Sequence, residues 1–220
     1  YDPELFRTIQ SYGTLVRELA DRGMLRFRLR DPTGPDAALG IFFVRKKNGT
    51  LRIIFDTRYL NTGFRAPPST ELPSASSLES IEVMCDDTAF IAHADLSKSF
   101  YGLEVPDSLG QRFTIPSLQA RLGGVSTING AAISPLALVE PYVITLPSGG
   151  NCALHRCQMY ISQVVERHIG IDHIFLDRHP GVNISGGLQT GAAYVDNFCV
   201  VSTSRDFADT LLADIVADLT

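Results

Sequence analysis

The stretch "GAAYVDNFCVVS", residues 191–202, places a carboxylate in the middle of an apolar run. The apolar residues on both sides predict two strands, and Asp196 and Asn197 lie where the chain has to turn between them. A charge in such a run needs a reason, and the plain alternative is a side chain that caps a turn. The question is what needs a carboxylate at residue 196 with a neutral amide beside it.

A second carboxylate also ends an apolar strand. In "TAFIAHADLSKSF", residues 88–100, the strand ends near Asp95 and a short turn or helix follows. A sheet can bring Asp95 and Asp196 together, and two carboxylates without basic partners repel each other unless a divalent cation lies between them. Mg²⁺ prefers such oxygen ligands, and two ions about 3.5–4 Å apart suit displacement at phosphorus. Without the cation, each Asp would only cap a turn.

Composition and charge limit the class of protein. The 220 residues are 45% hydrophobic and 20% charged, which is typical of a globular chain. The net charge of -5 counts against a dedicated nucleic-acid coat, but does not exclude a polymerase with locally concentrated basic residues. Four cysteines without C-x-x-C spacing predict reduced, mostly buried thiols in an intracellular protein, in either cytoplasm or nucleus. No apolar run reaches the roughly 20 residues of a membrane span, so we expect no membrane partner.

The remaining pattern predicts an α+β fold. Asn48-Gly49 between two β-rich runs predicts a hairpin over residues 41–56. Apolar periodicity predicts helices over 2–22, 151–169 and 204–219, with Asp2 and Ser204 as caps and Gly23 as a helix end. The helix faces expected to be buried are Leu5, Ile9, Tyr12, Val16 and Leu19 in the first, Leu154, Cys157, Ile161, Val164 and His168 in the second, and Phe207, Leu211, Ile215 and Leu219 in the third. Extended or loop segments are expected at 62–77 and 171–190, and short strands over 106–150. The start without Met and the end inside a helical pattern predict a fragment of a longer chain.

Two further segments could bind a ligand. Arg45, Lys46, Lys47 and Arg52 crowd one hairpin of an otherwise acidic chain and could hold phosphates, although a solubilised surface hairpin looks the same. In "LPSGGNCALHRCQ", residues 146–158, a Gly pair before a helix allows close approach of a ligand, although it also suits a plain turn.

Taken together and in order, these segments resemble a known family. "FFVRKKNGTLRIIFDTRYLN" (42–61) resembles the fingers hairpin of retroelement reverse transcriptases, and "ADLSKSFYGLEVP" (94–106) resembles their first catalytic motif. "LPSGGNCALHRCQ" is similar to their Leu-Pro-x-Gly loop and helix, and "YVDNFCVV" (194–201) is similar to their Tyr-x-Asp-Asp hairpin. Four motifs over most of the chain are more specific than any one of them.

The resemblance implies a right-hand polymerase fold within one reverse transcriptase-like domain, 1–220. The palm, an antiparallel sheet with helices on one face, would comprise roughly 86–106 and 147–220. The fingers would comprise roughly 1–85 and 107–146, and the thumb would be absent. The activity implied is RNA-directed DNA polymerisation, in which deoxynucleoside triphosphates extend a primer bound to an RNA or DNA template.

The resemblance also implies site residues. Catalytic carboxylates would be Asp95 and Asp196, and Mg²⁺, or Mn²⁺, would be bound by Asp95, Leu96 through its carbonyl, Asp196 and Asn197. Nucleotide contacts would come from Lys46 or Lys47, Arg52, Phe100 against the sugar, and Gly149 against the new base pair. Tyr194 would lie beside the primer end.

Departures from the family leave other hypotheses open. Asn197 stands where the family has Asp, and Ser148 where it often has Gln or Met. The chain could therefore be a decayed or truncated reverse transcriptase that binds nucleic acid weakly or serves as a structural module, or an unrelated α+β domain. A zinc site at Cys152, His155 and Cys157 is disfavoured. Asp56 and Arg58 are expected to form an ion pair that orders a turn.

Overall fold

The computed structural model describes residues 2–34, 36 and 39–219. The chain forms two compact units, which are described separately. Unit 1 comprises Tyr1–Ala66 and Phe100–Ala153, and unit 2 comprises Pro67–Ser99 and Leu154–Thr220. These boundaries differ from the expected fingers and palm at 67–85, which belongs to unit 2, and at 100–106 and 147–153, which belong to unit 1.

Unit 1 combines one long helix with small antiparallel sheets. Strands β1, β8 and β5 form one sheet in the order β1-β8-β5, while β2 pairs with β3 and β6 with β7. The bounds are α1 Ile9–Asp21, β1 Leu25–Leu29, β2 Gly40–Arg45, β3 Leu51–Asp56, α2 Arg58–Asn61, α4 Ser99–Gly102, α5 Asp107–Gly110, β5 Leu118–Gln119, α6 Ala120–Gly123, β6 Thr127–Ile128, β7 Ala131–Ala132 and β8 Leu138–Val143.

The core of unit 1 forms where α1 packs against the strands. Val16 of α1, Ile41, Phe55 and Val139 are among the side chains with 0–1% exposure. Removing such side chains from water is the main stabilising contribution in a unit of this size. The predicted hairpin 41–56 is therefore confirmed as β2 and β3, with its inward residues in this core.

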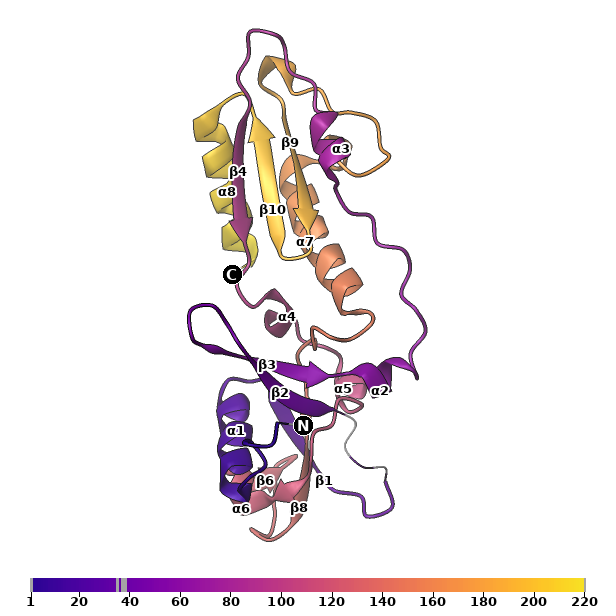
Figure 1. Cartoon of the computed structure of the whole chain (residues 1–220), viewed down its shortest axis with the longest axis vertical. Coiled ribbons are helices and arrows are strands. Elements are labelled where there is room, and N and C mark those ends of the chain that lie inside the picture. The colour runs from indigo at the N-terminus through magenta and orange to yellow at the C-terminus, as the bar shows by residue number, and fades with distance from the viewer. Residues whose placement is uncertain (1, 35, 37–38, 220) are drawn as a thin grey trace. The chain divides into compact units, whose positions relative to one another are not determined.

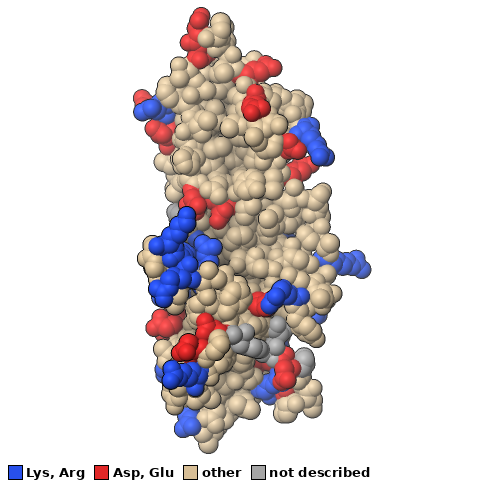
Figure 2. Space-filling model, viewed as in Figure 1, with Lys and Arg blue, Asp and Glu red and all other residues tan. Residues whose placement is uncertain are grey.

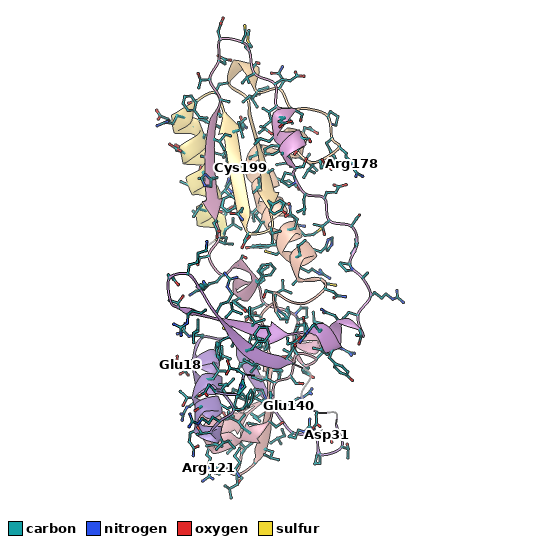
Figure 3. The ribbon with its side chains drawn as sticks, in the orientation of Figure 1. Glu18, Asp31, Arg121, Glu140, Arg178 and Cys199 are labelled. Carbon is teal, nitrogen blue, oxygen red and sulfur yellow. The ribbon has the colours of Figure 1, made fainter. Side chains whose placement is uncertain are left out.

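A buried acid also ties two strands of unit 1 together. Glu140 of β8, labelled in Figure 3, is 2% exposed. It binds Arg28 Nη2 of β1 at 2.6 Å and Nη1 of Arg30, the residue that follows β1, at 2.7 Å. Arg28 is the direct cross-strand partner of Glu140. A one-residue slip would move both arginines to the other face and leave the carboxylate buried and unpaired, so this cluster specifies the register.

Unit 2 is a three-stranded antiparallel sheet in the order β4-β10-β9. Its elements are α3 Ala75–Glu79, β4 Phe90–Asp95, α7 Ala153–Ile169, η1 Ile171–His173, η2 Ser185–Gly187, β9 Gln189–Tyr194, β10 Asn197–Ser202 and α8 Arg205–Leu219. Helices α7 and α8 lie on one face of the sheet (Figure 1). Ile161, Val165 and Ile215 from these helices are fully buried. The chain is thus a mixed α+β protein, as the sequence predicts.

Several predicted elements need correction. The first helix begins at Ile9 because Thr8 takes an extended conformation and accepts from Ser11 N, while Asp2 caps only a turn. Helix α3 begins inside the expected loop 62–77 and ends at Glu79, because Ser74 and Ser77 form a reciprocal capping box. Gly23, with φ +70, follows the helix end as predicted.

Exposure also differs from the predicted pattern at several positions. Ile9, Leu154 and Phe207 were expected on buried helix faces but are 56%, 44% and 44% exposed, and the Cys85 thiol is exposed rather than buried. Buried residues of α7 include Cys157, Ile161 and Val164, so the buried face of the helix is shifted from the predicted stripe at its start. None of the helices in the described part of the chain has the length and apolar character needed to cross a bilayer.

Candidate active site at one end of the unit 2 sheet

The two predicted carboxylates come from neighbouring strands and lie at the same end of the unit 2 sheet. Strand β4 ends at Asp95, and the antiparallel register places Asp95 directly opposite Asn197, the first residue of β10. One residue further, the Leu96 N–H donates to the Asp196 carbonyl at 2.8 Å. The sequence motifs around residues 95 and 196 are therefore adjacent in the fold.

Asp95, Asn197 and Tyr194 form a row across the three strands. Asn197 is opposite both Asp95 on β4 and Tyr194 on β9, and directly opposite residues of a sheet share one face. All three side chains are exposed. On β4 the exposed residues alternate, with Ile91, His93 and Asp95 outward, so this row lies on the face opposite the helices.

A two-residue loop, Val195–Asp196, joins β9 to β10. Val195 has φ +60, a backbone conformation that L residues rarely adopt, and Asp196 is outside the positive-φ region. A two-residue turn with this conformation normally has Gly at the first central position, and a left-handed conformation costs another residue about 1–2 kcal/mol. Backbone strain of this kind is found at functional sites.

No basic side chain of the described residues pairs with the two carboxylates at this end of the sheet. Neither Asp95 nor Asp196 forms an ion pair with a described residue; the Asn197 amide donates to Asp196 Oδ1 at 3.2 Å. The Leu96 carbonyl accepts from Ser99 N at 3.3 Å and keeps a second lone pair. Two carboxylates, an amide and a carbonyl are oxygen donors that suit Mg²⁺ or Mn²⁺. Among the described residues no three His, Cys, Asp or Glu side chains are grouped as a metal site.

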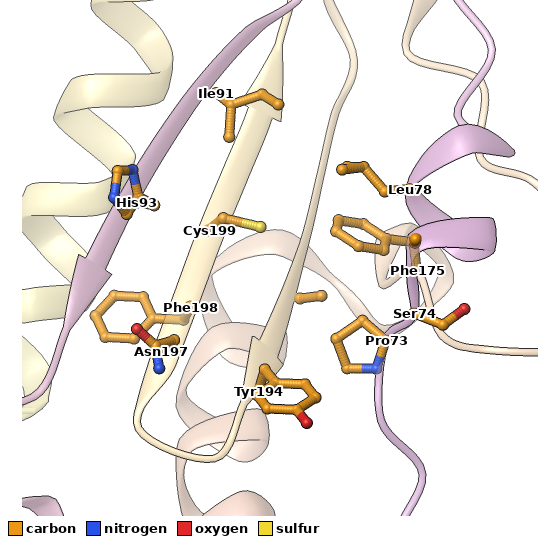
Figure 4. A pocket seen from close by; sticks show the side chains of 12 residues that line it. Pro73, Ser74, Leu78, Ile91, His93, Phe175, Tyr194, Asn197, Phe198 and Cys199 are labelled. Carbon is orange, nitrogen blue, oxygen red and sulfur yellow. The ribbon is translucent and has the colours of Figure 1, made fainter.

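A shallow pocket of about 270 Å³ opens beside this row on the same sheet face. Its walls are largely apolar, with Leu78 of α3, Ile91 and Phe175 among them, and Tyr194 and Asn197 lie towards one end (Figure 4). Cys199 also lines it, and burial raises the pKa of this thiol, which makes it a poor nucleophile. Apolar walls do not suit a triphosphate, so the pocket is no substitute for a basic nucleotide site.

The basic residues predicted to bind a nucleotide lie together in unit 1. Arg45, Lys46, Lys47 and Arg52 are all exposed around the tip of hairpin β2–β3, where Figure 2 shows a cluster of Lys and Arg. In the described part of the chain none of the four forms an ion pair. The cations are thus available to an anionic ligand.

The predicted ion pair at the end of this hairpin is confirmed. Arg58 binds Asp56 through Nη2 at 2.6 Å and Nε at 2.9 Å, and its backbone N–H donates to the same carboxylate. The hydrogen bond from Arg58 lowers the pKa of Asp56 to about 2. The pair orders the turn into α2, a structural role.

Gly149 and Phe100 also belong to unit 1. A Cβ on Gly149 would come within 2.9 Å of Thr57 Oγ1, so the position needs glycine for packing, whatever else it contacts. The Gly149 carbonyl accepts from Asn61 Nδ2 at 3.0 Å. Phe100 is half-buried in the short helix α4, and the next residue, Tyr101, donates to the Ile53 carbonyl at 2.9 Å.

Two residues that hold the predicted motifs were missed by the sequence analysis. Asn61 bonds both Gly149 and the backbone N–H of Asn151, and so orders the glycine loop from a distance. Gln158 is 3% exposed and bonds the backbone of the β9–β10 turn. A glutamine on the buried stripe of a predicted helix is the pattern that could have revealed it, because buried amides need partners.

His155, which the sequence placed in a disfavoured zinc site, forms a hydrogen bond with Thr70 Oγ1 at 3.0 Å.

The chain matches no model of a known protein family and no curated protein.

Proposed function

We propose that this chain is the fingers and palm of a reverse transcriptase-like domain, which extends a primer 3′-hydroxyl with deoxynucleotides on a nucleic-acid template. The observation that carries the proposal is the placement of Asp95 and Asp196 at one end of the unit 2 sheet, through the pairing of Asp95 with Asn197 and the Leu96–Asp196 backbone bond. Unit 2, with its antiparallel sheet and helices on one face, would be the core of the palm, and hairpin β2–β3 would belong to the fingers.

The metal that this reaction needs fits the donor set at the sheet end. Asp95, Asp196, the Leu96 carbonyl and the Asn197 amide oxygen would hold Mg²⁺ or Mn²⁺. The chemistry that a bound ion supplies is a lower pKa for the attacking hydroxyl and stabilisation of charge on the phosphate oxygens. The lack of an ion pair at either carboxylate among the described residues supports this assignment, because both charges stay available to a cation.

The chain's own residues would supply binding and orientation. The exposed cations of hairpin β2–β3, namely Lys46 or Lys47 together with Arg52, would bind the triphosphate through charge-assisted hydrogen bonds. Phe100 would exclude a 2′-hydroxyl from the sugar position. Tyr194, which is 52% exposed beside the carboxylates, would contact the primer end.

A second candidate function is a catalytically decayed domain with weak nucleic-acid binding or a structural role. Asn197 favours it, because the amide removes one of the charges that would attract a divalent cation. The small number of acidic groups at the sheet end favours it as well, since no group of three metal-binding side chains occurs in the described residues.

Primer extension distinguishes the two functions. The purified chain is given RNA and DNA templates with annealed primers, deoxynucleotides, and Mg²⁺ or Mn²⁺ in separate titrations. We expect extension that depends on the metal and is lost in Asp95→Asn. The domain should bind primer-template weakly, with an affinity that falls steeply with salt, because few phosphate contacts are available. No extension with either metal, with Mn²⁺ binding also absent, would overturn the polymerase and favour the decayed domain.

A further inference from the structure

The turn that carries Asp196 needs support from outside the hairpin. Val195 is β-branched and takes the left-handed conformation, φ +60, at a position where a two-residue turn favours glycine. Nothing in the residue itself favours this conformation. It persists only where surrounding contacts over-determine it.

Helix α7 holds both backbone groups of Val195. The Val195 N–H donates to Gln158 Oε1 at 2.6 Å, and the Val195 carbonyl accepts from Cys157 Sγ at 3.6 Å. The other end of the same amide, Gln158 Nε2, donates to the Ala193 carbonyl at 2.8 Å. Gln158 therefore bridges the strand end and the turn with one side chain.

Burial makes this bridge hard to replace. Gln158 is 3% exposed and Cys157 is fully buried, so water cannot readily take over the same bonds. Beyond Val195, the next carbonyl, that of Asp196, is held by Leu96 N at 2.8 Å. The backbone is thus held immediately before and at Asp196, and the direction of the Asp196 side chain follows from it.

We infer that Gln158 is a positioning residue, which holds Val195 in the left-handed conformation and thereby sets the direction of the Asp196 carboxylate at the sheet end. Only the last step, the use of that carboxylate to bind a divalent cation, depends on the proposed function. The bonds themselves are a property of the fold. Gln158 is distinguished from an ordinary buried amide because both of its ends bind the backbone of the β9–β10 hairpin.

The test compares Gln158→Met, which keeps the length and loses both polar atoms, with Gln158→Glu, which keeps the acceptor for Val195 and loses the donor. Ser162→Ala is the matched control, because Ser162 Oγ accepts from Gln158 Nε2 at 2.9 Å within the helix and forms no hydrogen bond with the hairpin in the described part of the chain. Two readouts are used: hydrogen exchange of the Val195 amide by NMR without metal, and the Kd for Mn²⁺ by electron paramagnetic resonance.

We expect Gln158→Met to speed exchange of the Val195 amide about tenfold and to weaken Mn²⁺ binding by a similar factor, the size of one lost buried hydrogen bond. Gln158→Glu should keep more of the protection, and Ser162→Ala should match wild type in both readouts. In a Val195→Gly background the loss of Mn²⁺ affinity from Gln158→Met should shrink, because glycine adopts the turn without help. If Gln158→Met fails to fold, Gln158→Glu gives the same comparison with Ser162→Ala.

Unchanged exchange of the Val195 amide in a folded Gln158 variant would overturn the inference. Faster exchange with unchanged Mn²⁺ affinity would also overturn it, since the turn would then be released without any change in metal binding by Asp196. A wild-type chain that binds no Mn²⁺ would count against the proposed function instead, and the exchange rates would still decide whether Gln158 holds the turn.

Discussion

The two hairpins that carry the predicted motifs are held in opposite ways. The β2–β3 tip is supported by its own residues: Asn48 Oδ1 accepts from the Thr50 N–H and hydroxyl, Lys46 N donates to Thr50 O, and Gly49 takes φ +83. The β9–β10 turn has a valine at φ +60 and depends on Gln158, Cys157 and Leu96 from other elements.

The difference shows where each hairpin's shape comes from. The turn preference of Asn48 and Gly49 favours the first hairpin locally. Its exposed basic residues can be substituted without disturbing the fold. The second hairpin has an unfavourable turn that the surrounding unit 2 enforces. A strained turn next to a carboxylate is what a site with a required geometry would use, so the contrast supports a functional role for Asp196.

The largest expected effect separates the two hairpins by their roles in the proposed reaction. Asp196→Asn should lower primer extension about a thousandfold, because a divalent metal supplies several kcal/mol of the catalysis.

On the other hairpin, Lys46→Ala or Lys47→Ala should raise KM for the deoxynucleotide about tenfold with little change in kcat. Steady-state kinetics measure both, with Asp206→Asn on the exposed surface of α8 as control. Equal effects of both lysines would show that the hairpin acts as a general basic patch.

The next effect concerns the amide beside Asp196. Asn197→Asp should lower the metal concentration needed for half-maximal extension about tenfold to a hundredfold. Like charges about 4 Å apart repel by roughly 4 kcal/mol at an effective dielectric constant near 20, and a divalent cation between them more than offsets this. Metal titration of both proteins measures the change. A wild-type chain that already works at low Mg²⁺, with a slower Asp variant, would make Asn197 an adapted ligand.

A smaller effect tests the turns themselves. Gly49→Val should lower the free energy of unfolding by about 1–2 kcal/mol, because valine is strained at positive φ. No atom lies within 4 Å of the added Cβ, so packing does not contribute. Val195→Gly should instead raise it by about 0.5 kcal/mol, as relief of strain exceeds the entropy cost of glycine. Urea unfolding measures both changes, and a loss of stability in Val195→Gly would show that its turn is not strained.

The smallest effect is confined to the end of β3. Arg58→Gln should return the pKa of Asp56 from about 2 towards 3.8. Because the folded-state pKa is lowered, the ion pair stabilises the protein fully above pH 3.8, and this contribution is lost as the pH falls through about 2. Wild type and variant should therefore differ in stability above pH 3.8 and not below about pH 2. Arg58 is 88% exposed, so solvent screens the pair and the difference in stability should be small. NMR titration of the Asp56 carboxyl measures the pKa, and an unchanged value would contradict the local ion pair.

Local chemistry explains which elements could be predicted. Asn48-Gly49 predicted hairpin β2–β3, apolar periodicity predicted α1, α7 and α8 apart from their ends, and the Asp56–Arg58 pair is only two residues apart. The failures came from capping and burial that depend on distant residues. Thr8 rather than Asp2 starts α1, and the exposure of Leu154 and Phe207 follows from how each helix meets the sheet.

The sequence by itself determined the α+β composition, the two hairpins and the identity of the carboxylates and cations that could do chemistry, because turn propensity and hydrophobic period act over a few residues. Only the tertiary structure decided that Asp95 lies opposite Asn197, that Glu140 binds Arg28 and Arg30, and that Gln158 holds Val195. Those contacts join residues far apart in the chain. Strand register and burial are set by the whole packed unit, and a local pattern carries no information about them.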